Sequence, residues 1–273
     1  MDCLVLAQLH TKQIHRYYNS PAIAASYGGQ GYITPCERLL FNTHIKPGMA
    51  ILDIGVGGGR TSQYLAGNAS RYVGIDYAPE MVRICREKFP QWEYMEASAT
   101  DLSPFQSGSF DAVVLSYNML DDLVPDESRW RCLEECHRVL RENGFLIFSS
   151  HNPRAILARP KRDNADSRSA TYKSAISSIP ALLRKTLHWS ASFFIAAYIS
   201  LRRVFSYGSK LPFWQGEGYM LDCENLMTHF AIPRKIIAEL VRYGFKFIAL
   251  QGDDYPKKSH LLITEWYYYV FAR

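Results

Sequence analysis

Long apolar runs are missing from this 273-residue sequence. No stretch approaches the roughly 18 consecutive apolar residues typical of a membrane-spanning helix. The segment 1–7 also lacks the basic region that opens a secretory signal peptide. Internal repeats and low-complexity tracts are absent as well. We therefore expect one globular protein in the cytoplasm.

Paired cysteines are the second absence. The six cysteines are scattered without the framework of a disulfide-rich protein, which indicates a reducing environment. Cys132 and Cys136 lie one helical turn apart, with His137 beside them. A metal site is conceivable there, but buried thiols on a helix are the better interpretation, and we predict no metal.

Glycine is concentrated at one place, where four glycines occur within five residues after the apolar run 50–54. A glycine turn between a strand and a helix lets the backbone approach a ligand closely. The dinucleotide fingerprint G-x-G-x-x-G fails, because Arg60 stands where its third glycine belongs. The P-loop fails too, since no Gly-Lys-Ser/Thr follows. What remains is an acid followed by alternating glycines: Asp53, Gly55, Gly57 and Gly59.

This pattern resembles the first motif of the class I S-adenosylmethionine (SAM)-dependent methyltransferases. The resemblance implies SAM as the cofactor, bound along Gly55, Gly57 and Gly59. It also implies that Asp53 pairs with the ammonium of SAM, directly or through water. The alternative is a plain strand-turn-helix of another α/β protein.

Residues 71–76 form a second short apolar stretch, which ends on Asp76. A carboxylate at the end of the second strand can accept hydrogen bonds from both hydroxyls of a ribose. The run 74–81 resembles the second methyltransferase motif, and we add Tyr77 and Met81 to the predicted cofactor contacts. Two motifs in order strengthen the resemblance.

Further cofactor contacts follow from the resemblance alone. Tyr27 matches a tyrosine that faces the methionine end of the cofactor, although it could equally fix an N-terminal cap to the core. Ser98 and Ala99 align with the turn that binds adenine. The family usually has an acid where Ser98 stands, which puts that side-chain contact in doubt. Ser116 and Asn118 follow the fourth strand, beside the transferable methyl group.

Three titratable side chains are candidates for catalysis. His151 follows the apolar strand 145–150, and an open parallel sheet binds its ligands at the carboxyl ends of its strands. Imidazole titrates near neutrality, as a general base must. Asp121 and His229 are the second and third choices. The alternatives are a loop-bonding histidine at 151 and a solvated or capping aspartate at 121.

The order of expected elements predicts an α/β fold. We expect a seven-stranded, mostly parallel sheet with an antiparallel last strand, formed by a single domain over 1–273. A helical cap covers 8–46, and the strands 245–250 and 262–271 close the sheet as a hairpin. A helix over 126–142 should end at Asn143-Gly144 and bury one stripe, made of Trp130, Leu133, His137 and Leu140.

A basic insertion over 152–217 interrupts this plan. Residues 154–212 hold eleven lysines and arginines against two aspartates, a net charge of +9 within an overall +5. An apolar helical stripe runs from Leu183 to Phe205. The insertion could be a lid, a homodimer contact, or a peripheral contact with an anionic membrane. Its charge favours an anionic acceptor, such as a phosphorylated or lipid-linked intermediate.

We therefore predict a SAM-dependent methyltransferase that acts on a small or medium-sized acceptor through a hydroxyl or an amine. The acceptor would be a metabolite, a sugar or a lipid-linked intermediate. One alternative is an RNA methyltransferase that uses the basic insertion as its binding surface. Against it, the Asn-Pro-Pro-Tyr motif of amine methylation is missing, since residues 116–119 read Ser-Tyr-Asn-Met. The other alternative is a SAM-binding protein without catalysis.

Overall fold

Parallel strands form the centre of the protein. The computed structural model describes residues 3–29, 31–155, 215–221 and 226–273. The parallel strands are β1 (Ala50–Ile54), β2 (Arg71–Asp76), β3 (Glu93–Glu96), β4 (Phe110–Leu115) and β5 (Leu140–His151). The predicted apolar runs 50–54 and 71–76 become strands β1 and β2, whereas β5 begins five residues before the predicted strand 145–150. All five residues of β1 are buried, as expected for a strand covered on both faces.

The sheet is completed by an antiparallel hairpin of β8 (Lys246–Gly252) and β9 (Trp266–Ala272). In the described part of the chain the strand order is β3-β2-β1-β4-β5-β9-β8, and β9 pairs antiparallel with β5. The predicted seven-stranded sheet with an antiparallel last strand is thus confirmed. The order reverses between β1 and β4, which is where open α/β sheets bind their ligands.

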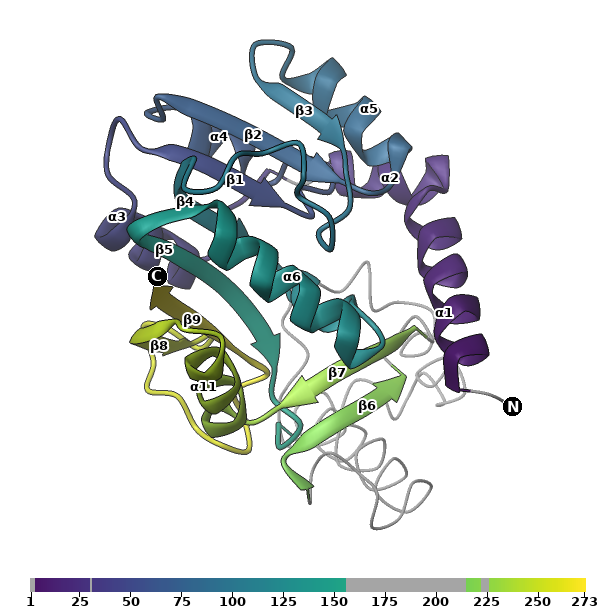
Figure 1. Cartoon of the computed structure of the whole chain (residues 1–273), viewed down its shortest axis with the longest axis vertical. Coiled ribbons are helices and arrows are strands. Elements are labelled where there is room, and N and C mark those ends of the chain that lie inside the picture. The colour runs from purple at the N-terminus through teal and green to yellow at the C-terminus, as the bar shows by residue number, and fades with distance from the viewer. Residues whose placement is uncertain (1–2, 30, 156–214, 222–225) are drawn as a thin grey trace, which may run out of the picture.

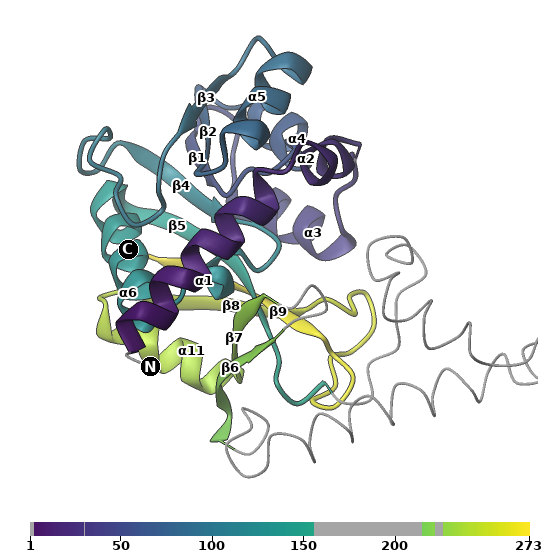
Figure 2. The same ribbon diagram turned by 90° about the vertical axis from the view of Figure 1, so that its right-hand side faces the viewer.

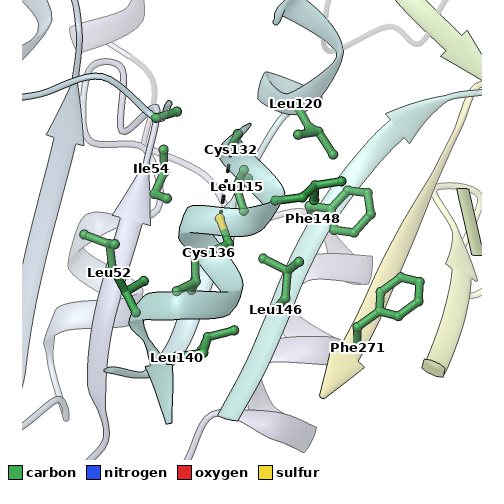
Figure 3. Close-up of a cluster of buried hydrophobic side chains, with 14 of the residues drawn as sticks. Leu52, Ile54, Leu115, Leu120, Cys132, Cys136, Leu140, Leu146, Phe148 and Phe271 are labelled. Atoms are coloured by element: carbon green, nitrogen blue, oxygen red, sulfur yellow. Dashed lines mark hydrogen bonds between the residues drawn. The ribbon is translucent and has the colours of Figure 1, made fainter. Parts of the chain in front are cut away.

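Helices cover both faces of the sheet (Figure 1). One face packs against α6 (Asp126–Val139) and α11 (Pro233–Arg242), which lie in front of the sheet in that view. The other face packs against α3 (Pro35–His44), α4 (Ser62–Ala66) and α5 (Pro79–Lys88). The first core combines aliphatic, aromatic and cysteine side chains. Figure 3 shows Cys132 and Cys136 of α6 facing Leu52, Ile54 and Leu146 on the strands.

The N-terminal cap consists of α1 (Cys3–Tyr18), α2 (Pro21–Gly28) and α3. Thr34 begins α3 with a reciprocal capping box, in which its hydroxyl accepts from the Glu37 N–H and its own N–H donates to the Glu37 carboxylate. Figure 2 looks at the side to which the arrowheads of β1, β2 and β5 point, and α1 crosses the front of that view. Helix α1 therefore lies over the carboxyl ends of the strands, whereas α3 packs on a face of the sheet.

The helix predicted over 126–142 is shorter than expected. It ends at Val139, and the backbone of Leu140 is already extended. Asn143 has φ 61° but lies inside β5, where its N–H donates to the carbonyl of Arg273. The predicted cap at Asn143-Gly144 is therefore wrong, because β5 begins before it and pairs Leu140 with Phe110.

The predicted buried stripe of this helix is wrong in part. Trp130 is exposed, and His137 is only half-buried beside Phe245. The fully buried side chains of α6 are instead Arg129, Cys132, Leu133, Cys136 and Val139. The two cysteines are free thiols with sulfurs 4.0 Å apart. Within the described residues no group of side chains could hold a metal ion.

A second, two-stranded sheet was missed by the sequence analysis. It pairs β6 (Glu217–Leu221) with β7 (Met227–Ala231) in antiparallel register. A one-turn helix, η1 (Met119–Asp122), lies between β4 and α6 and contacts both β5 and β7. Most of the predicted insertion and its apolar stripe lie outside the described residues. Among those described, no helix combines the length and apolarity needed to cross a membrane.

Candidate active site

The glycine turn after β1 lies where the strand order reverses. Gly57 has φ 53°, a left-handed conformation that side chains with a Cβ rarely adopt. Gly58 is needed for a different reason. A Cβ there would lie 2.4 Å from the amide nitrogen of Gly28 and 2.4 Å from the carbonyl carbon of Tyr27. The end of α2 is therefore seated directly on the glycine turn, a role that the alternating motif did not predict.

Tyr27 lies beside this turn. Its ring carbon Cδ1 is 3.6 Å from the position of a Cβ at Gly57, and its ring meets that of Tyr18 edge-on at 5.9 Å. It also packs against the buried side chains of Ala24 and Met81. The ring joins the cap to the core and lies beside the turn. Its predicted contact with the methionine end of the cofactor stays a prediction.

Arg60 fastens the turn to the rest of the cap. Its guanidinium forms a two-pronged ion pair with Glu37, at 2.5 and 2.8 Å. The same group lies over the rings of Tyr32 and Tyr117, at 5.2 and 5.0 Å from their centres. The residue that breaks the dinucleotide fingerprint thus connects α3, the glycine turn and the end of β4.

Asp76 ends β2 beside the same turn. One carboxylate oxygen accepts from the N–H of Gly57 and the other from the N–H of Ala78, each at 2.9 Å. Burial raises the pKa of Asp76 to about 6, although these backbone bonds act to lower it. Each oxygen retains a second lone pair, so the carboxylate can also accept from the two hydroxyls of a ribose.

Asp53 has hydrogen-bond partners of a different kind from those of Asp76. Its carboxylate is fully buried, and one oxygen accepts from the hydroxyls of Thr61 and Tyr72 at 2.8 and 2.9 Å. Burial raises the pKa of Asp53 to about 6. The Asp53 side chain thus connects the end of β1 to Thr61, the residue that precedes α4. Its predicted contact with an ammonium stays a prediction.

The turn predicted to bind adenine is more exposed to solvent than the glycine turn. Ser98 is exposed, and its hydroxyl bonds to that of Thr100 at 2.8 Å, while Ala99 is buried. Met81 is buried next to the cap, and Tyr77 lies 5.6 Å from the ring of His15. Among the described residues, the Tyr77 hydroxyl has no hydrogen-bond partner. A buried polar atom without a partner is suited to meet a ligand.

The three catalytic candidates converge at the ends of β5, η1 and β7. Asp121 is fully buried, and one of its oxygens accepts from both the N–H and Nδ1 of His151, at 2.7 and 2.8 Å. Its other oxygen accepts from the Ser150 hydroxyl at 2.8 Å and lies 3.8 Å from Nδ1 of His229. The sequence predicted these three residues separately, and the fold brings them together.

The charge of Asp121 is secured by its neighbours. Burial acts to raise its pKa, but interactions with His151 and His229 outweigh burial and lower the pKa to about 2. Asp121 is thus a carboxylate at any physiological pH. Neither loop charge nor a helix cap describes it, since its partners are the two histidines and Ser150.

Asn118 fixes the other side of the imidazole. Its side-chain amide lies 3.2 Å from Nε2 of His151, and its backbone N–H donates to the Ser149 hydroxyl at 2.8 Å. Both Tyr117 and Asn118 have positive φ, at 60° and 63°. Consecutive strained residues at a strand end are typical of functional sites. Ser116, the other contact predicted here, is half-buried.

His151 is the accessible member of the cluster, with a quarter of its side chain exposed. Its ring packs against Phe230 at 4.9 Å and meets Trp266 edge-on at 6.0 Å. His229 is buried, and its Nε2 lies 2.8 Å from the guanidinium of Arg129. A substrate can therefore reach His151 but not His229, so His151 alone is placed to exchange a proton with a ligand.

Comparisons with known proteins agree with this geometry. A family profile described as "Methyltransferase domain" matches residues 52–148. An uncharacterized methyltransferase of Synechocystis sp. is 35% identical over 115 residues, which are 42% of this chain and 53% of that protein. A ubiquinone biosynthesis O-methyltransferase of Xanthomonas oryzae pv. oryzae is 38% identical over 109 residues, 38% of this chain and 44% of the relative. The chain thus spans about half the length of the curated relatives it matches.

Solved structures share the fold at low sequence identity. A SAM-dependent methyltransferase of Mesorhizobium loti superimposes with a TM-score of 0.57 at 16% identity, over 87% of this chain and 97% of that one. The 1,6-didemethyltoxoflavin-N1-methyltransferase of Burkholderia thailandensis, with S-adenosylhomocysteine bound, gives 0.56 at 13% identity, over 98% and 88%. Residues 52–148 thus match a methyltransferase domain, and the chain shares the fold of class I SAM-dependent methyltransferases.

Proposed function

We propose that this protein transfers the methyl group of SAM to a hydroxyl of a small-molecule acceptor, with His151 as the general base. The observation that carries the proposal is the His151–Asp121 pair, 2.8 Å apart, at the strand ends beside the glycine turn. A base is useful for a hydroxyl acceptor, which must lose its proton as the new bond forms.

The residues around the turn fit the cofactor of the family. Asp76 would accept from the ribose hydroxyls, Tyr27 would face the methionine end, and Ala99 would offer its N–H to adenine. Tyr77 supplies a buried hydroxyl with no partner among the described residues. SAM supplies a methyl group on a sulfonium, which is already activated for displacement. The protein adds alignment of the two reactants, worth several kcal/mol.

The proton path follows from the hydrogen bonds. An Nδ1–H of His151 that donates to Asp121 leaves Nε2 as the acceptor nitrogen, and this is also the atom that the Asn118 amide contacts. Nε2 would take the acceptor's hydroxyl proton while the oxygen forms its bond to the methyl carbon and the carbon–sulfur bond breaks. Asp121 then stabilises the imidazolium through the same Nδ1–H.

Two sets of observations bear on the acceptor. The rings of Phe230 and Trp266 flank His151, so an apolar or aromatic acceptor would pack beside the base. Several relatives are named O-methyltransferases, which is in line with a hydroxyl. The RNA alternative and the anionic acceptor depend on the basic insertion, most of which lies outside the described residues, and both stay predictions.

The test is labelled methyl transfer from SAM to a panel of phenols, catechols and matched primary amines. We expect products from hydroxyl acceptors, and His151→Ala should slow turnover by about 10²–10⁴-fold while SAM affinity stays unchanged. His44→Gln is the matched control, because His44 lies on α3, outside this cluster. Transfer to amines only, or a loss below about tenfold in His151→Ala, would contradict the base. SAM binding without any transfer would favour the non-catalytic alternative.

A further inference from the structure

Arg129 is a fully buried arginine on α6 that the mechanism above leaves without a role. Its guanidinium donates to the Glu239 carboxylate at 2.8 Å and lies 2.8 Å from Nε2 of His229. Asp126 is 3.7 Å away. A buried arginine carries a large desolvation cost, so a site that retains one in this position demands an explanation.

The contact with His229 fixes which of its ring nitrogens bears the proton. All five N–H groups of a guanidinium are donors, and the group keeps its charge in proteins. At 2.8 Å from Arg129, Nε2 of His229 must therefore accept, and the ring proton must be on Nδ1. That nitrogen is the one that faces Asp121, at 3.8 Å.

Other groups around His229 favour or oppose protonation of its imidazole. Burial lowers its pKa, whereas the carboxylates of Asp121 and Glu217 raise it. The Glu217 oxygen is 3.5 Å from Nε2, and the Tyr219 ring is 5.3 Å from the imidazole. Together these groups raise the pKa of His229. The contact with Arg129 opposes the rise, because a proton on Nε2 would place two cationic donors 2.8 Å apart in a buried site.

We propose that Arg129 keeps His229 neutral and thereby reserves the charge of Asp121 for the imidazolium of His151. Arg129 is then a positioning residue that acts through His229 and Asp121. The proposal rests on the proposed role of His151 as the base. A cationic His229 would pair with Asp121 on the side opposite His151, and Asp121 would then stabilise the imidazolium of His151 less.

The first test needs no activity. Nitrogen-15 NMR of the histidine rings in the whole chain should show His229 as the neutral Nδ1–H form from about pH 7 to about pH 8.5. The signal is assigned by its loss in His229→Asn. Arg129→Met, which keeps the length of the side chain without its charge, should let His229 titrate within that range. A wild-type His229 that is cationic or carries its proton on Nε2 at neutral pH overturns the proposal.

The second test uses the pH dependence of kcat on a hydroxyl acceptor. Arg129→Met should lower kcat about tenfold and move the acid limb of the kcat–pH profile by about one pH unit, with the KM for SAM unchanged. Adding His229→Asn, which is neutral at every pH, should restore both toward wild type. Arg131→Met is the control, since Arg131 is an exposed arginine of the same helix.

A double variant no better than Arg129→Met would show that Arg129 only supports the fold, and would refute the proposal. Thermal unfolding of each variant shows whether it folds. If Arg129→Met does not fold, the NMR result on the wild-type protein decides between the proposal and its alternative. Absence of any methyl transfer would refute the proposed function instead, while the His229 signal would still report on Arg129.

Discussion

Gly58→Ala is the substitution that tests how the cap is seated on the glycine turn. The added Cβ would lie 2.4 Å from two backbone atoms of residues 27 and 28, where ordinary contacts begin at 3.4 Å. The turn and the end of α2 must then separate by about 1 Å. Neither side can yield through a rotamer change, because both are backbone.

Separation of this size costs about 1–3 kcal/mol, as overpacking of a well-packed site does. If SAM binds between the turn and Tyr27, its affinity should fall by roughly tenfold to a hundredfold. Isothermal titration calorimetry with SAM and with S-adenosylhomocysteine measures this, after circular dichroism confirms the fold. Gly31→Ala is the matched control, because a Cβ at Gly31 in the same cap meets nothing within 4 Å. Equal affinity in the two variants would refute the seating of the cap on the turn.

Three further predictions concern single side chains. The pKa of Asp76 is raised to about 6, so SAM affinity should weaken as the pH falls through 6 and the carboxylate is lost, and calorimetry should find this dependence absent in Asp76→Asn. Asp121→Asn should lower kcat by about 10²–10⁴-fold, because Asp121 would orient His151 as the base. The Kd for SAM should stay unchanged. An unchanged kcat would show that the His151–Asp121 pair is not the base. Phe148→Ala should lower the free energy of unfolding in urea by about 3–5 kcal/mol, because Phe148 is buried and stacked on Tyr269 at 5.0 Å, and a loss below about 1 kcal/mol would mean that the core of Figure 3 repacks.

Sequence patterns were sufficient where local chemistry determines structure. The buried strands β1 and β2 agree with the predicted apolar runs, and the glycine turn lies where the first motif placed it. The convergence of Asp121 and His151 was predictable in principle, because the carboxyl ends of neighbouring parallel strands meet at one edge of the sheet. His229 joins them from β7, an element that the sequence did not indicate.

Long-range partners explain most of what was missed. Arg129 was not among the buried residues predicted for this helix, because its partners Glu239 and His229 follow about 100 residues later in the chain. With Arg129 on the buried face, Trp130 is turned outward, and the stripe read from the sequence was out of phase. Asn143-Gly144 is typical of a helix end, but pairing between Leu140 and Phe110 extends β5 through it.

We propose that SAM binds at the glycine turn beside Asp76, with its methyl group toward His151. The most direct measurement is a crystal structure of the protein with S-adenosylhomocysteine. We predict ribose hydroxyls within hydrogen-bond distance of the Asp76 carboxylate, and the sulfur on the side of the sheet edge where Asn118 and His151 lie. A nucleoside bound away from Asp76, or a sulfur that faces away from His151, would contradict the claim.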